Sequence, residues 1–128
     1  MDDKTLHMTM IFDFFGELLP NKQREYFDLY YNEDLSLFEI AEKAGITRQG
    51  VHDAIARAEN TLEGIEAKTG VVRRWLEARA QIDEITDRVR DALDGARDYE
   101  DSHVNDGAMA VLREILESLE RLKEKHGV

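Results

Sequence analysis

The sequence lacks cysteine altogether and contains a single proline, Pro20, among its 128 residues. Without cysteine, the chain can form neither disulfide bonds nor thiolate metal sites. No run approaches the roughly 20 apolar residues that span a membrane. The first residues carry two acids and lack the basic and apolar regions of a signal peptide. We therefore expect a soluble, cytoplasmic protein that does not insert into membranes.

Positive charge is also scarce. The chain has 17 lysine and arginine residues against 28 aspartate and glutamate residues, which gives a net charge of −11. A polyanion repels nucleic acid at long range unless its basic residues gather on one face. A nucleic-acid function therefore requires a local basic patch, whatever the fold.

What the sequence does contain is a series of helix signals. Apolar residues recur at three- and four-residue spacing over residues 6–18, 22–31, 37–44 and 51–62, which predicts four amphipathic helices. The proline separates the first two helices, and Asn21 is the expected cap of the second. The predicted apolar face of the first helix consists of Leu6, Met10, Ile11, Phe14, Phe15 and Leu18.

Residues 37–58 have the pattern of a helix-turn-helix. Ser36 lies three residues before Glu39, the spacing of a capping box. Gly45 is suited to a left-handed turn, and Thr47 can cap the next helix. Small and apolar residues at fixed positions would hold the two helices together, namely Ala41, Ile46, Val51 and Ile55. The alternative is a plain helical bundle in which the glycine only ends a helix.

Beyond residue 69 the sequence predicts two long helices. Their expected apolar seams are Trp75, Ala78, Ile82, Ile85, Val89 and Ala92 in one helix, and Ala108, Leu112, Ile115, Leu119 and Leu122 in the other. These seams can close as a hairpin, across a two-fold axis with a second chain, or around a partner's helix. We expect an all-α protein with a helix-turn-helix domain over residues 1–68 and a hairpin or dimerisation extension over residues 69–128, and we favour a homodimer.

One stretch of the chain resembles a known family. The matching residues lie between Lys4 and Lys68, about half of the chain. They resemble the YlxM family, which is similar in turn to region 4 of bacterial sigma factors. The residues that carry this resemblance are Lys22, Gln23, Tyr26, Leu29, Tyr30, Tyr31, Glu33, Asp34, Ser36, Leu37, Glu39, Ile40, Ala41, Glu42, Arg48, Gln49, Val51, Asp53, Arg57 and Glu59.

The resemblance implies a role in the signal recognition particle pathway, with the particle's protein or RNA as partner. Three positions depart from the family pattern: Gly50 stands where alanine is usual, His52 where an aromatic residue is common, and Ala56 where lysine is common. The glycine should loosen the second helix by about 1 kcal/mol if it is exposed. The missing lysine removes a positive charge from any phosphate-binding surface.

The predicted contact surface is the start of the second helix of the helix-turn-helix. Its residues are Thr47, Arg48, Gln49, His52 and Arg57. Arginine and glutamine can contact base edges or phosphates, and a helix N-terminus favours an anion. However, residues 21–68 contain six basic residues against ten acidic ones, so binding to duplex DNA alone should be weak.

The sequence offers little for catalysis, and we expect neither an enzyme nor a cofactor. The four histidines are scattered and show no metal-binding spacing. In the acidic loop, Asp98, Glu100, Asp101, Asn105 and Asp106 lack the ligand order of a calcium site and indicate a solvated linker instead. Three hypotheses remain: an accessory or regulatory protein of the signal recognition particle pathway, a dimeric DNA-binding transcriptional regulator, and an interaction module that uses the C-terminal helices.

Overall fold

The structure is a computed structural model that describes residues 2–97 and 106–126. The described parts are almost entirely helical, and their elements are α1 (Asp3–Phe15), the 3₁₀ helix η1 (Gly16–Leu18), α2 (Asn21–Tyr31), α3 (Leu37–Ala44), α4 (Arg48–Thr69), α5 (Val71–Arg97) and α6 (Asp106–His126). The predicted all-α fold is confirmed. The chain divides into two compact units, residues 1–73 and residues 74–128.

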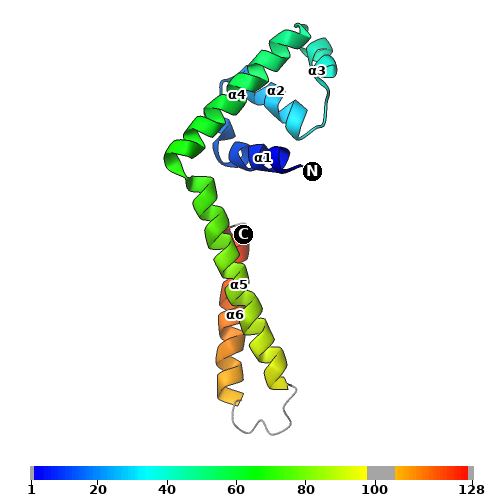
Figure 1. Cartoon of the computed structure of the whole chain (residues 1–128). Coiled ribbons are helices and arrows are strands. Elements are labelled where there is room, and N and C mark those ends of the chain that lie inside the picture. Colours follow the sequence, from blue (N-terminus) through cyan, green and yellow to red (C-terminus); the bar gives the residue numbers. More distant parts are fainter. Residues whose placement is uncertain (1, 98–105, 127–128) are drawn as a thin grey trace. The chain divides into compact units, whose positions relative to one another are not determined.

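In the first unit, the long helix α4 packs against α1, α2 and α3 (Figure 1). The centre of this unit is the fully buried ring of Phe27 on α2. This ring stacks on Phe12 at 4.6 Å and on Tyr31 at 4.4 Å between ring centroids. From α4, the side chains that enter the core lie at helical spacing on one face; they are Val51, Ile55, Ala58 and Leu62.

The first two helices differ in detail from the sequence-based prediction. Met8 and Ile11 are the buried residues of α1, whereas Leu6, Phe14 and Leu18 are exposed, the last at 67%. The 3₁₀ turn at η1 changes the rotation per residue, so the apolar spacing of α1 does not continue to residue 18. The predicted cap at Asn21 is wrong. Helix α2 starts one residue earlier because the carbonyl of Pro20 already accepts from the backbone N–H of Arg24.

In the second unit, α5 and α6 lie side by side and antiparallel (Figure 1). The seam between them differs from the predicted one. On α5, Thr86 and Leu93 are buried, while Ile85 is 48% exposed. On α6, the partly buried residues are Met109, Leu112, Leu116, Leu119 and Lys123, whereas Ile115 and Leu122 are exposed. Each helix carries more than one line of residues at four-three spacing. At several positions, the residue that packs in the seam is the one next to the predicted residue.

The predicted acidic linker lies almost entirely outside the described residues. Asp98, Glu100, Asp101, His103 and Asn105 lie outside the described residues. The linker hypothesis for this acidic stretch therefore stays a prediction.

Candidate functional site

The turn between α3 and α4 determines the direction in which α4 begins. Gly45 adopts the left-handed conformation with φ of 69°, which glycine enters without steric cost. The backbone N–H groups of Gly45 and Ile46 both donate to the carbonyl of Ala41, at 2.9 and 3.2 Å. Two residues after the glycine, the Thr47 hydroxyl accepts from the N–H of Gly50 at 2.9 Å and caps α4. The chain thus leaves one helix and enters the next within three residues.

The other end of α3 is fixed by the capping box expected from the sequence. The Ser36 hydroxyl accepts from the N–H of Glu39 at 3.1 Å, and the Glu39 carboxylate accepts from the N–H of Ser36 at 3.2 Å. Ile40 and Ala41 are buried against the core as expected. Ile46, by contrast, is 42% exposed; its expected packing role is wrong because the left-handed glycine turns the chain outward just before it.

All five predicted contact residues are exposed. The structure brings four of them together at the start of α4, and Arg57 lies nine residues beyond Arg48, about 13 Å further along the helix axis. Their roles differ, since the hydroxyl of Thr47 is engaged in capping α4. Arg48, Gln49 and His52 are therefore the side chains of this group that can reach a partner at the helix start.

Asp53 is a residue of this surface that the sequence analysis did not choose. Its Oδ1 accepts a hydrogen bond from Nε2 of Gln49 at 2.8 Å and lies 3.5 Å from Nδ1 of His52. The hydrogen bond from Gln49 has the larger effect and the one from His52 the smaller; together they hold the pKa of the Asp53 carboxyl below its ordinary value. The carboxylate is therefore ionised at neutral pH, and it interacts with the side chains of both Gln49 and His52. A glutamine four residues before an aspartate on one helix is the sequence signal that could have found it.

The outermost side of α4 carries both signs of charge. At 100° per residue, the side opposite the buried face is formed by Gln49, Asp53, Arg57 and Asn60, all of which are exposed. The first turn of α4 contains no acidic residue, so the positive end of the helix dipole is not neutralised there. Among the residues that the structure describes, Arg48 makes no ion pair. The surface therefore has a positive end followed, one turn later, by a negative charge.

Position 56, where the family often has lysine, does not belong to this outer side. Ala56 is partly buried and lines a small cavity with Tyr30, Tyr31 and Glu59. The Tyr31 hydroxyl donates to Oε1 of Glu59 at 2.8 Å; burial first, and then this hydrogen bond, raise the tyrosine pKa far above its ordinary value. The loss of a lysine at this position therefore leaves the outermost side of α4 unchanged.

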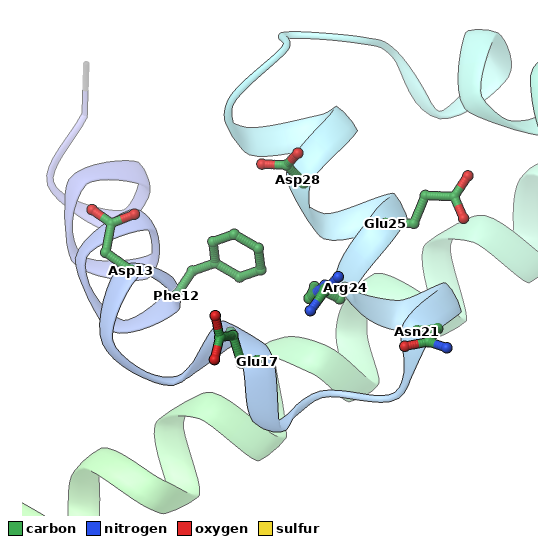
Figure 2. Close-up of a pocket in the computed structure, with 8 residues that line it drawn as sticks. Phe12, Asp13, Glu17, Asn21, Arg24, Glu25 and Asp28 are labelled. Atoms are coloured by element: carbon green, nitrogen blue, oxygen red, sulfur yellow. The ribbon is translucent and has the colours of Figure 1, made fainter.

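A larger cavity, of about 660 Å³, lies between α1, η1 and α2. Figure 2 shows four carboxylates around it, from Asp13, Glu17, Glu25 and Asp28, with the guanidinium of Arg24 as the only cation of its lining. Phe12 contributes an aromatic wall. An opening with this charge favours cations and repels phosphate, so the cavity and the start of α4 present opposite electrostatic character.

The described residues contain no cluster of three or more histidine and carboxylate side chains that could hold a metal ion. No helix within the described ranges is long and apolar enough to cross a membrane.

The fold and the geometry of α3 and α4 agree with the comparison to known proteins. Residues 2–101 match the family model UPF0122, described as "Putative helix-turn-helix protein, YlxM / p13 like". The chain belongs to the UPF0122 family. The match continues past Lys68, where the resemblance noted in the sequence ended, and so takes in the whole of α5.

Several UPF0122 proteins are similar over about two thirds of the chain or more. One from Thermoanaerobacter sp. (strain X514) is 41% identical over 122 residues, which cover 95% of this chain and 98% of that protein. One from Halalkalibacterium halodurans is 40% identical over 123 residues, 96% of this chain and 100% of that protein. One from Caldanaerobacter subterraneus subsp. tengcongensis is 49% identical over 85 residues, 66% of this chain and 73% of that protein. Membership in a family described as helix-turn-helix favours contact with nucleic acid or a partner protein as the function.

Proposed function

We propose that this protein is a non-enzymatic accessory or regulatory protein that acts through the exposed start of α4. The observation that carries the proposal is the arrangement of Arg48, Gln49 and His52 on the first turns of a helix whose N-terminus holds no acidic residue. The YlxM resemblance supports the signal recognition particle pathway as the setting, with the particle's GTPase or its RNA as the partner.

Asp53 provides a test of the partner's chemistry because it places a negative charge inside the proposed contact surface. The substitution Asp53→Asn removes this charge but keeps an oxygen that can accept from Gln49. If the partner is RNA or DNA, the substitution removes repulsion from phosphate, so affinity should rise and depend more steeply on salt. If the partner offers a basic protein surface, affinity should fall.

The experiment begins with affinity capture from native lysate, with and without nuclease, using the wild-type chain, Arg48→Ala/Gln49→Ala and Asp53→Asn. Asp13→Asn is the matched control, since it removes one exposed negative charge from α1 instead of α4. Recovery of the particle's GTPase or RNA, reduced in the double variant, supports the proposal. Recovery that is unchanged in both α4 variants contradicts the site.

A second candidate function is a dimeric DNA-binding transcriptional regulator. Two features favour it: the first turn of α4 has no acidic residue, and Arg48 makes no ion pair with any residue that the structure describes. Asp53 and the net charge of −11 oppose it. Capture of a defined DNA fragment by the purified protein at low salt, with steep loss as salt rises, would favour this function over the first.

A third candidate is an interaction module that uses only the C-terminal helices. A chain ending at about residue 73, where the first compact unit ends, should keep its partner if α4 is the contact surface and lose it if the hairpin is.

A further inference from the structure

The two sides of the α5–α6 hairpin have different chemistry. On one side, Nη2 of Arg90 lies 3.4 Å from Oε1 of Glu120, which joins the two helices by an ion pair. Two helical turns away along α5, Nζ of Lys123 lies 2.6 Å from Oδ1 of Asp83. Both ion pairs link α5 to α6. They therefore fix the register of the antiparallel hairpin and make this side of it charged.

The opposite side carries the large exposed apolar residues of the hairpin, together with Gln81 and Arg88 of α5. In an antiparallel helix pair, the residues directly after the seam positions of both helices flank one side, and those directly before them flank the other. Arg90 and Glu120 belong to the first set. The second set includes Ile85 before the buried Thr86, and Ile115 before the partly buried Leu116. The large exposed apolar residues of this side are Ile85 (48% exposed), Val111 (53%), Ile115 (41%) and Leu122 (40%).

The seam between the two helices contains two polar positions, Thr86 and Lys123, among its apolar residues. Thr86 is buried within it and donates its hydroxyl hydrogen bond to the carbonyl of its own helix at Ile82, at 2.7 Å. Lys123 occupies a seam position of α6 and turns its ammonium to Asp83. A hairpin with such a seam gains further stability by burying its apolar side against another surface.

The charge pattern along α6 fits a second copy of the same helix. Val111, Ile115, Ser118 and Leu122 form a stripe at four-three-four spacing. When two such stripes are laid antiparallel, heptad geometry places each Ile115 opposite Ser118 of the second copy, and each Val111 opposite Leu122. The small serine permits close approach of the two helices.

In the same register, the charges that flank the stripe are complementary. Glu114 of one copy lies opposite Arg121 of the other, and the two-fold axis repeats this pair. Both side chains are exposed, and the Arg121 guanidinium lies along the stripe, where it donates to Oγ of Ser118 at 3.2 Å. In a parallel arrangement, g positions face e positions of the other copy, so Glu114 would lie opposite Leu119 and no Glu114–Arg121 pair would form. The sequence of α6 is thus self-complementary in one orientation only.

The available area is sufficient for a stable dimer. Helix α6 has 21 residues, which gives a length of about 31 Å. With two helices about 10 Å apart, each hairpin offers a side of roughly 600 Å², and two copies would bury about 1,200 Å², the lower bound for a specific interface.

We propose that two copies of this protein associate through the apolar side of the hairpin, with the α6 helices antiparallel across a two-fold axis. The interface consists of Val111, Ile115, Ser118 and Leu122, and the Glu114–Arg121 pairs set its orientation. This inference does not depend on what α4 binds, because it rests only on the second unit.

The test is sedimentation velocity on the full chain over a wide range of concentration. Wild type should dimerise, and Ile115→Lys, a substitution at an exposed site, should be a monomer with unchanged circular dichroism. Glu114→Arg alone should raise the dissociation constant about tenfold, because two attractive pairs become repulsive. Combining it with Arg121→Glu should restore the wild-type value. Glu117→Arg, the same charge change on another side of α6, is the control and should leave the constant unchanged.

A monomeric wild-type chain at every concentration would overturn the proposal. So would a dimer that persists in Ile115→Lys, or one that Glu117→Arg weakens as much as Glu114→Arg. Failure of the double variant to recover would overturn the antiparallel orientation on which the proposal depends. None of these outcomes bears on the capture experiment at α4, so the two proposals can fail separately.

Discussion

The same substitution at two glycines of the first unit should change stability in opposite directions. Gly64 lies in the interior of α4, and a Cβ added there meets nothing within 4 Å. Because alanine favours a helix over glycine by about 1 kcal/mol, Gly64→Ala should raise the free energy of unfolding by about that amount. For a unit of this size, the midpoint of thermal unfolding should rise by roughly 4–8 °C.

Gly45 is the position to compare with Gly64. A Cβ added there also meets nothing within 4 Å, so packing does not distinguish the two sites. Its φ of 69° is the difference, because alanine in the left-handed region costs about 1–2 kcal/mol. Gly45→Ala should therefore lower the free energy of unfolding by that amount.

Urea unfolding followed by circular dichroism, with thermal unfolding as a second measure, would provide both values on the full chain. The reasoning is refuted if both substitutions shift stability in the same direction, or if Gly64→Ala is destabilising. In the first case backbone conformation would not control these positions; in the second, α4 would need the flexibility of glycine at its centre.

Two further predictions concern the capping box and the hairpin. Ser36→Ala removes the acceptor for the N–H of Glu39 and should destabilise the first unit by about 1 kcal/mol, as measured by urea unfolding; an unchanged midpoint would mean that the box contributes nothing. The hydrogen bond from Lys123 lowers the pKa of Asp83 from its ordinary 3.8, so its stabilisation is complete above that pH and is lost as the pH falls through the lowered value. Helicity should therefore fall more on acidification in wild type than in Asp83→Asn, and equal acid profiles would contradict this.

The sequence by itself determined the features that short-range interactions control. The capping box at Ser36, the left-handed end at Gly45 and the cap at Thr47 each depend on groups within four residues of one another. Such groups meet in any helix that forms. For the same reason the exposed positions of Arg48 and Gln49 followed from helical spacing alone.

Tertiary structure alone decided which of several possible apolar faces is buried. On α1 the core takes Met8 and Ile11 and leaves Leu6 in solvent. On α6 the seam takes Leu116 and leaves Ile115 exposed. Neighbouring apolar stripes on one helix satisfy the same periodicity, so the choice between them depends on the shape and charge of the helix that packs against them. That choice left Ile85, Ile115 and Leu122 exposed, although four-three spacing in the sequence had placed them in the seam between α5 and α6.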